Sequence, residues 1–589
     1  MSTKTEHPSD GVSRNPMLIR RETGKMALTY VGGSVCASLV TIIDTLIAGV
    51  SIGSEALAAI SVAAPLLMIA QILHCLLGYG IDKLMIRSIG EGKREEANRI
   101  FAAILAAVVV VFVVVYAALL LFERPLLQLI LSDQSLTDTV IDYTWPLFLA
   151  SPAIETFLCI ERAFRVDGRA RLFSARGIVT NIANIAFDVL LVTILGLGVN
   201  GLAWASVIST VIGYMVTLSH FFSKKRTVSP DFSVLSCKEE LLSYVKRDIR
   251  LGSTATLDEV LSTVALSVQT AAIGLIGGTG GLAMWTVYKS LKGVAQSVGE
   301  GASASVSVHA GLLYGQEDYD GVRFCIKEGL AIAMVLSAVE SVIVLIFAQQ
   351  IASLYGVDSQ YLVSCAVSLR IGCAAFIVVS TITVFNAYLS SVGKVDLANR
   401  LVMLEYGLIV VAVAVGYSMG LWGFLACYVV AIWIVTLVYA VVTIRDRYWF
   451  VPEQSPESIA TYSIRLTPDQ ITALTTSIDS DLAAIGETAS FASRVALVVE
   501  DSTCLTLRYN AEADVRMDLE IKRHEDGVCL LALDDGKPYN ALAQIVQQSE
   551  DRLDMLEVSV VRAFTSNMSY NRALDINQSS LVVRRPAKA

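Results

Sequence analysis

The feature that most constrains this chain is a series of long apolar runs. The clearest run, residues 101–122, has no charged residue along its whole length. A helix needs about 20 apolar residues to cross the hydrocarbon core of a bilayer. We therefore expect an α-helical polytopic membrane protein with twelve transmembrane helices. The approximate cores of these runs are residues 26–50, 57–80, 100–122, 139–161, 172–196, 199–222, 252–276, 282–305, 326–348, 362–389, 399–417 and 421–444.

Composition narrows the class further. Apolar residues make up 54% of the chain and charged residues 17%, against about 25% charged in soluble domains. The net charge of −9 says nothing useful about nucleic acid, because the basic residues lie in short connections next to apolar runs. We expect no nucleic-acid partner. The ten cysteines show no CxxC spacing, which argues against a zinc site or a disulfide framework.

The distribution of Lys and Arg predicts the topology. These residues gather in every second connection, which is typical of cytosolic loops, although the eighth connection (Gly311–Arg323) is acidic. The first two dozen residues are polar and lack the apolar core of a signal peptide. We expect a protein of the inner (cytoplasmic) membrane with both termini in the cytosol. The predicted parts are an N-terminal tail (1–24), a first lobe (25–223), a cytosolic linker (224–250), a second lobe (251–445) and a cytosolic domain (453–589).

The membrane part contains an internal repeat. The segment GSEALAA (53–59) resembles GTGGLAM (278–284), and the same offset of 225 residues aligns Gly90 with Gly315. Because both halves start on the same side, the repeat is parallel, with its axis along the membrane normal. We therefore predict two lobes of six helices around a central cavity whose access alternates.

Acids within the apolar runs mark the candidate ion site. The run 177–201 carries Asn181, Asn184 and Asp188, which share one face of a helix. An acid at bilayer depth is costly and normally has a function, although a polar contact between helices is the alternative. Asp44 lies in the first run, and its repeat position in the second half holds Gln269. This asymmetry predicts a cation or proton site confined to the first lobe.

Six segments stand in order along the membrane part: DTLIAG (44–49), ALAA (56–59), RSIG (87–90), DG (167–168), NIAFD (184–188) and GVNGLA (198–203). Together they resemble the multidrug and toxic compound extrusion (MATE) family over roughly residues 20–445. The resemblance implies a two-lobed exporter of cations or drugs, driven by an inward Na⁺ or H⁺ gradient and needing no other cofactor. It places the ion site on Asp44, Asn184 and Asp188, where Na⁺ is a possible ligand, with Ser206 as a weaker candidate.

Basic residues in the second half bear on the substrate. We assign a small-molecule cavity to Asn181, Gln269, Lys289, Lys292 and Arg370. For Arg370 the alternative is a position near the membrane interface, from which its side chain reaches toward the lipid headgroups. Export of polycations needs acids in the cavity, whereas these three basic residues would bind an anionic group such as a phosphate. A flippase for lipid-linked precursors is therefore an alternative function.

The composition changes after residue 447, and residues 453–589 predict a small cytosolic α/β domain. Alternating segments at 516–523 and 528–533 predict strands, and the periodicity of 490–509 and 551–565 predicts helices. The domain resembles the ATPase domain of anti-sigma-factor serine kinases, in the histidine-kinase-like superfamily. That resemblance implies a nucleotide site at Glu500, Asp501, Asp534 and Gly536.

The expected Mg²⁺-binding Asn and Gly-rich lid are missing from this domain. Cys504 or Leu505 stands where the Asn is expected, and the segment RLDML (552–556) replaces the lid. We therefore expect no ATP hydrolysis. Weak nucleotide binding, a cytosolic protein partner, a regulatory role and a plain structural role stay open. A membrane receptor that signals through this domain is the remaining alternative function.

Overall fold

The structure is a computed structural model of the 589-residue chain. It describes residues 12–14, 17–51, 63, 66–69, 71–130, 134–167, 170–222, 228–355, 357, 359–446, 449–452, 458–510, 514–538, 552–574 and 576–585. For residues 39–51 the description covers the backbone alone.

Long helices form the first half of the membrane part. One π-helical turn interrupts them directly after α6, and short 3₁₀ turns follow α5 and α7. The elements are α1 (Met17–Ser51), α3 (Ile81–Gly90), α4 (Arg94–Ile130), α5 (Gln134–Phe164), η1 (Arg165–Asp167), α6 (Ala170–Asp188), η2 (Val189–Ile194), α7 (Gly198–Leu218) and η3 (Ser219–Phe222).

The second half is helical as well. Its first helix, α8, runs over 78 residues but has a non-helical backbone at Gly278 (φ 54°, ψ −146°), so it consists of two limbs. The break falls between the predicted seventh and eighth runs, at a position that glycine tolerates well. The elements are η4 (Phe232–Ser236), α8 (Lys238–Gly315), α9 (Tyr319–Leu354), α10 (Leu362–Gly372), η5 (Cys373–Ala375), α11 (Phe376–Ser391), α12 (Val395–Tyr417) and α13 (Gly420–Asp446).

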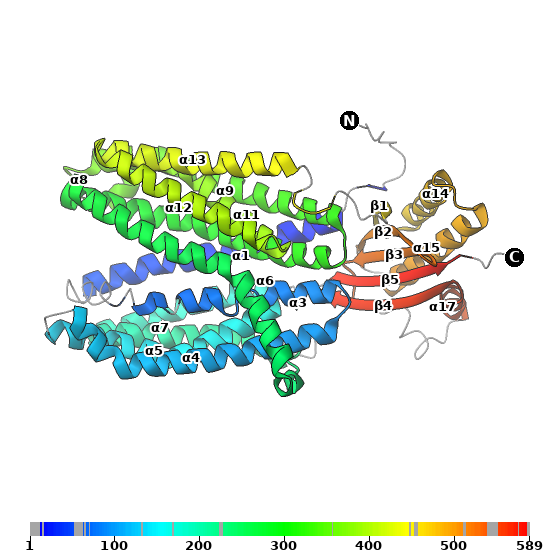
Figure 1. The fold of residues 1–589 in the computed structure, drawn as a ribbon, viewed down its shortest axis with the longest axis horizontal. Helices are drawn as coiled ribbons and strands as arrows, with labels where there is room; N and C mark the ends of the chain where they lie inside the picture. The colour runs from blue at the N-terminus through cyan, green and yellow to red at the C-terminus, as the bar shows by residue number, and fades with distance from the viewer. Residues whose placement is uncertain are drawn as a thin grey trace.

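Nine helices in the described ranges are long and apolar enough to cross a membrane. The prediction of twelve spans therefore stays a prediction. Buried side chains form two large clusters in the membrane part. One is built mainly from α8–α13 and the other mainly from α3–α5. Figure 1 shows the corresponding two layers of helices, and α1 packs along α6, α8 and α9.

The two layers approach each other closely where α3 and α8 end. A Cβ atom built on Gly90 would lie 2.3 Å from the Leu312 carbonyl oxygen and 3.1 Å from the Cα of Gly315. Small residues of this kind let two helix backbones come together. Gly90 and Gly315 are the pair that the internal repeat relates, so the two halves meet at equivalent positions.

The C-terminal domain is a five-stranded antiparallel sheet with strand order β1-β2-β3-β5-β4. Two strands and two helices cover the segments in which the sequence predicts them. The elements are β1 (Ser458–Arg465), α14 (Pro468–Ala484), α15 (Ala489–Tyr509), β2 (Arg516–His524), β3 (Gly527–Asp534), α17 (Arg552–Phe564), β4 (Thr565–Ala573) and β5 (Ile576–Arg584).

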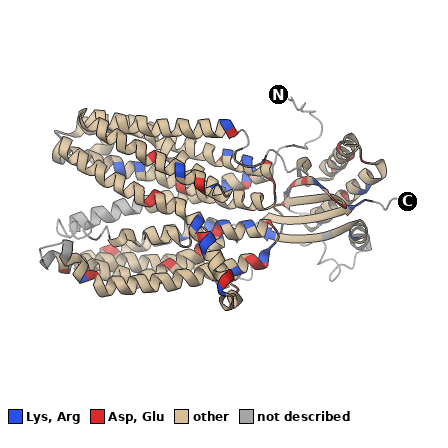
Figure 2. Ribbon diagram, in the orientation of Figure 1, with Lys and Arg blue, Asp and Glu red and all other residues tan. Residues whose placement is uncertain are grey.

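The two faces of this sheet have different neighbours. Met517, Leu519 and Ile521 of β2 pack with the helices of the domain. The alternate residues of a strand point to the opposite face, and there Asp518 and Lys522 bond to the first turn of α1 and to Gln316 after α8. The domain adjoins one end of the helix bundle (Figure 1). Lys and Arg gather toward that same end in Figure 2. The end of the bundle that carries the domain is thus the end that the charge distribution predicts to be cytosolic.

Candidate functional site

Asp188 lies at a change of helix type. It is the last residue of α6, and the π-helical turn η2 begins at the next residue. Its side chain is fully buried (0% exposed), Asn184 one turn earlier is 4% exposed, and Asn181 is half-buried. Single π-helical turns in α-helices frequently occur at functional sites. Asp188 and Asn184 are therefore buried together, directly before the π-helical turn.

The other members of the predicted ion site lie on neighbouring helices. Asp44 belongs to α1, but its side chain lies outside the described residues. α1 packs against α6, where a Cβ on Gly33 would lie 3.3 Å from the Cα of Ser174. Ser206 is half-buried on α7, which also packs against α6. The structure thus brings the three helices together, and the convergence of the side chains stays a prediction.

The second lobe contains a polar cluster that sequence reasoning found only in part. The Tyr406 hydroxyl of α12 donates a hydrogen bond of 2.9 Å to Asp258 on the first limb of α8. Glu405, the neighbour of Tyr406, is 8% exposed. On the second limb of α8, Lys292 places its Nζ 5.6 Å from the ring centre of Tyr428. Acids, a lysine and tyrosines from α8, α12 and α13 therefore form one cluster.

This cluster changes the interpretation of the second half. The positions that the internal repeat pairs with Asp44 and Asp188 hold no acid in the second half. Glu405 and Asp258 nevertheless place acids at other positions of that half. Glu405 was missed, although an acid inside the apolar run 399–417 is the same signal that identified Asp188. Polar chemistry in the membrane part is therefore not confined to the first lobe.

The remaining predicted cavity residues are spread over α8 and α10. Gln269 is buried on the first limb of α8, and Lys289 is half-buried on the second limb. Arg370 is exposed in the last turn of α10, and its Nε donates a hydrogen bond of 3.2 Å to the Leu345 carbonyl oxygen of α9. Arg370 thus ties two helices together.

A first prediction concerns the Asp258–Tyr406 bond. Tyr406→Phe removes the hydroxyl that donates to the Asp258 carboxylate, and both side chains are half-buried. We therefore expect the variant to lose about 1–2 kcal/mol of stability. Thermal unfolding of the purified protein in detergent measures the loss. The control is Tyr417→Phe, at the exposed end of the same helix. Equal unfolding temperatures for both variants would contradict the role of the bond.

The first lobe also holds buried charges close to the end that carries the C-terminal domain. The Arg162 guanidinium donates to His74 Nε2 at 2.9 Å, and His74 Nδ1 lies 2.8 Å from the Glu155 carboxylate. Because arginine can only donate, Nε2 is the accepting nitrogen and Nδ1 carries the proton that His74 donates to Glu155. The three groups thus form a chain of charge-assisted hydrogen bonds between the second predicted span and α5.

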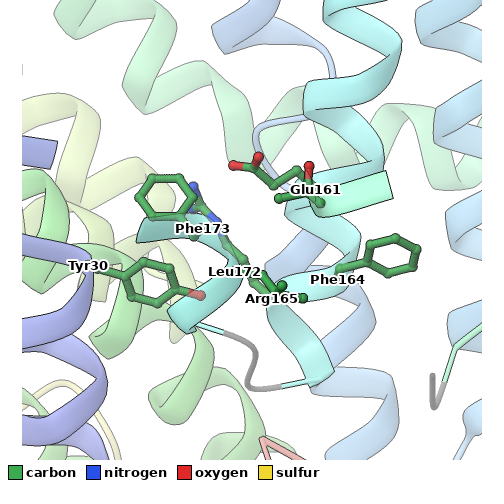
Figure 3. A pocket seen from close by; sticks show the side chains of 7 residues that line it. Tyr30, Glu161, Phe164, Arg165, Leu172 and Phe173 are labelled. Atoms are coloured by element: carbon green, nitrogen blue, oxygen red, sulfur yellow. The ribbon is translucent and has the colours of Figure 1, made fainter. Parts of the chain in front are cut away.

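A small pocket lies in the same lobe, between residues of α1, α5, α6 and α7 (Figure 3). Arg165 lines it and lies 3.6 Å from Asp82, and Glu161 lines it and lies 2.7 Å from Arg176. Aromatic rings of Tyr30 and Phe173 complete the wall (Figure 3). The arginines that predict a cytosolic connection are therefore packed into the lobe as ion pairs.

Two residues of the predicted nucleotide site, Asp534 and Gly536, are bonded within the C-terminal domain. Asp534 Oδ1 accepts hydrogen bonds from the Gly536 N–H (2.9 Å) and from Asn577 Nδ2 (2.7 Å). Burial raises the pKa of Asp534 to about 6, against the lowering effect of these bonds. Glu500 is exposed on α15, and Asp501 is half-buried. Asp534 and Gly536 thus lie together, whereas Glu500 points to solvent.

A second prediction tests this network. Asn577→Ala leaves the buried Asp534 carboxylate without one of its donors, and we expect a loss of about 2–3 kcal/mol in the stability of the domain. Hydrogen exchange of β3 and β5 in the full-length protein measures this loss. Ser579→Ala, in the same strand, is the control and should leave the exchange unchanged.

Within the described residues, no group of three or more His, Cys, Asp or Glu side chains is arranged to hold a metal ion. That statement does not cover Asp44, whose side chain lies outside the description. A Na⁺ ion at Asp44, Asn184 and Asp188 therefore remains a prediction.

Comparisons with known proteins now place the chain. The probable multidrug resistance protein YoeA of Bacillus subtilis (strain 168) is 23% identical over 371 residues, which covers 62% of this chain and 79% of that protein. An outward-facing multidrug resistance MATE family transporter of the MOP superfamily has a TM-score of 0.67 at 19% identity, covering 74% of this chain and 99% of its own. A MOP superfamily transporter from Pyrococcus furiosus Vc1 (DSM3638), described by the reverse polarity of its binding pocket, has a TM-score of 0.66 at 20% identity, with the same coverage.

The structural likenesses show the fold, and the family comparison covers more than half of the chain. The MatE family model matches residues 31–190 and 255–416. These segments contain α6 with Asn184 and Asp188, part of the first limb of α8, and the whole second limb with Lys292. Members of this family are transporters and not enzymes. The chain belongs to the MATE family of transporters.

Proposed function

We propose that this protein is a secondary exporter of small molecules that couples efflux to inward movement of H⁺ or Na⁺. The observation that carries the proposal is Asp188, a fully buried acid inside an apolar run, directly before a π-helical turn. A buried acid in a membrane helix normally serves transport of ions or substrates. The name of the Bacillus subtilis relative supports drugs as the substrate class.

The coupling follows from differential affinity. Asp44 and Asp188 repel each other when both are charged and close together, and a proton or a Na⁺ ion relieves that repulsion. Asn184 would supply an amide oxygen to Na⁺, and Ser206 a hydroxyl oxygen. An ion that binds one arrangement of α1 and α6 better than the other shifts the population toward it. The π-helical turn next to Asp188 gives α6 a place where this rearrangement costs little.

The wider architecture is part of the proposal. Twelve helices form two lobes, residues 25–223 and 251–445, joined by the cytosolic linker 224–250. Both termini lie in the cytosol at the inner membrane. Substrate binds between the lobes near Asn181, Gln269 and Lys289. The domain 453–589 regulates transport, and a cytosolic protein or a nucleotide is its possible ligand.

An anionic substrate is the second candidate. Lys289 and Lys292 are half-buried on one limb of α8, a placement that suits a phosphate group such as that of a lipid-linked precursor. This lipid flippase would use the same alternating access with a substrate of opposite charge.

The experiment is gradient-driven transport in proteoliposomes that contain the full-length protein. A cationic dye is loaded, and either a H⁺ or a Na⁺ gradient is imposed. Dye movement under one gradient alone supports the exporter and identifies the ion. Movement of a phosphorylated lipid analogue, and none of the dye, would favour the flippase. A folded protein that moves neither would refute transport as its function and favour a receptor that signals through the domain.

A further inference from the structure

The C-terminal domain is attached to the membrane part at several points. Strand β2 provides the first attachment. The Asp518 carboxylate accepts hydrogen bonds from the N–H groups of Leu18 (3.4 Å) and Ile19 (3.3 Å), in the first turn of α1. The Lys522 ammonium donates to the Gln316 carbonyl oxygen at 2.6 Å, directly after α8. We call Asp518 and Lys522 the β2 anchor.

The β4–β5 hairpin provides the second attachment, to α3 and to the turn that follows α5. The Leu574 N–H donates to the Val166 carbonyl oxygen at 2.9 Å, next to α5. Asn571 Nδ2 donates to the Ile89 carbonyl oxygen at 3.3 Å, near the end of α3. Ala573 and Leu574 are buried within the hydrophobic cluster of the first lobe, whereas Ile576 belongs to the cluster of the second. We call Ala573, Leu574 and Ile576 the hairpin tip.

The backbone of the hairpin tip is strained. Leu574 has φ +58°, in the left-handed region that non-glycine residues rarely adopt. Such a conformation costs about 1 kcal/mol or more and persists only where the surroundings impose it. Here the hairpin itself requires the positive φ, because Ala573 pairs with Ile576 and a two-residue turn joins the strands. The Val166 bond and the apolar packing of the first lobe then hold this tight turn against the transporter.

We propose that the C-terminal domain is a cytosolic clamp: the hairpin tip lies between the two lobes, the β2 anchor holds α1 and the α8–α9 turn, and the cytosolic side opens only when the tip leaves the first lobe. The clamp rests on the proposed function, because it regulates the same alternating access. It favours the state in which Gly90 and Gly315 are in contact, which has the cytosolic ends closed.

The location of the contacts supports release at the tip. The β2 anchor binds α1 and α8, which pack against each other along their length. The tip, in contrast, has neighbours in both hydrophobic clusters, so separation of the lobes must break one set of its contacts.

The clamp also has buried titratable groups in its interface. Asp518 and Glu520 of β2 face Asp318 of the α8–α9 turn, and all three are buried beside Lys522. Arg323 and Asp320 of α9 are the next charged groups, and Ser463 and Ser458 of β1 donate to the acids. Burial raises the pKa of Asp518 to about 7 and that of Glu520 to about 8.

A pH dependence follows from these raised pKa values. If undocking exposes the two acids and returns their pKa values toward 4, the docked domain binds more protons than the undocked one. Docking is then favoured as the pH falls below about 7, and it weakens as the pH rises through 7 to 8. The closed population of the wild type should therefore decrease between pH 6 and pH 8.5. The double variant Asp518→Asn, Glu520→Gln should show a flatter profile.

The decisive test measures the separation of the lobes in the full-length protein without any substrate. Spectroscopic labels are placed as unnatural amino acids at Glu95 and Lys327, two exposed positions at the starts of α4 and α9. Leu574→Gly removes the side chain that packs in the first lobe and relieves the positive φ, so the hairpin itself remains foldable. We expect the ratio of long to short distances to rise about ten-fold or more.

Two further variants complete the design. Lys522→Gln weakens the β2 anchor and should also increase the long distances. Arg585→Gln removes an exposed ion pair with Glu487 inside the domain and should leave them unchanged. Unchanged distances in both Leu574→Gly and Lys522→Gln would overturn the clamp. The readout uses no transported molecule, so a protein that exports nothing can still support the clamp, and an active exporter can refute it.

Discussion

Asp188→Asn should reduce gradient-driven transport by about 100-fold, the upper range of coupling between two sites. Asparagine has nearly the same size as aspartate but can neither carry a negative charge nor take up a proton. The buried position at the start of η2 then no longer changes its charge with ion binding. Initial rates of dye movement in proteoliposomes under the driving gradient measure this effect.

The control for this substitution is Asp142→Asn. Asp142 is exposed on α5 and undergoes the same chemical change outside the proposed site. It should retain the transport rate of the wild type. Full transport by a correctly folded Asp188→Asn protein would remove Asp188 from the mechanism and leave it as a polar contact between helices.

Gly301→Val should have the largest effect on the packing of the two lobes. A Cβ atom on Gly301 would lie 2.4 Å from the Cα and 2.5 Å from the backbone nitrogen of Val31 in α1. Backbone atoms cannot rotate away as side chains can, so α1 and α8 must move apart. Overpacking of this kind typically costs about 1–3 kcal/mol. Thermal unfolding in detergent should show the loss.

Gly293→Val is the matched control, because Gly293 lies on the same limb of α8 and a Cβ atom there meets nothing within 4 Å. The two substitutions add the same side chain to the same helix. If both proteins unfold at the same temperature, the close approach of α1 and α8 does not limit the packing.

The sequence predicted the parts of the fold that depend on local patterns. The apolar runs located the helices, and the glycine-rich segment around Gly278 separated two runs that the structure joins across a break. Asp188 stood out because an acid in an apolar run is costly wherever the helix packs. The MATE resemblance rested on such local signals, and the family comparison confirmed it.

Contacts between distant segments could not be predicted in the same way. The alternation of β2 predicts a strand with one apolar face, and charged residues normally place the other face in solvent. The structure instead buries Asp518, Glu520 and Lys522 against the membrane part. No local pattern indicates that segments 206 to 500 residues away in the chain cover them. For the same reason the bond between Asn577 and Asp534 emerged only from the folded sheet.

The bond between Asp258 and Tyr406 is a further example. Each residue is visible in the sequence, but their separation of 148 positions conceals the contact. Asp44, in contrast, lies in a helix that its apolar run alone predicted, since α1 covers the run 26–50.

The pairing of Ser13 with Ser463 has a kinetic consequence. The two residues exchange backbone hydrogen bonds of 2.9 and 2.7 Å, so the segment before α1 forms an extra edge on strand β1. The domain is thereby tethered from both sides, through this pairing and through the chain that leaves α13. For a module held by short tethers, the effective concentration at its binding surface is in the millimolar range. Detachment of the tip would then be short-lived, and recapture would be faster than the capture of any partner that must diffuse from the cytosol.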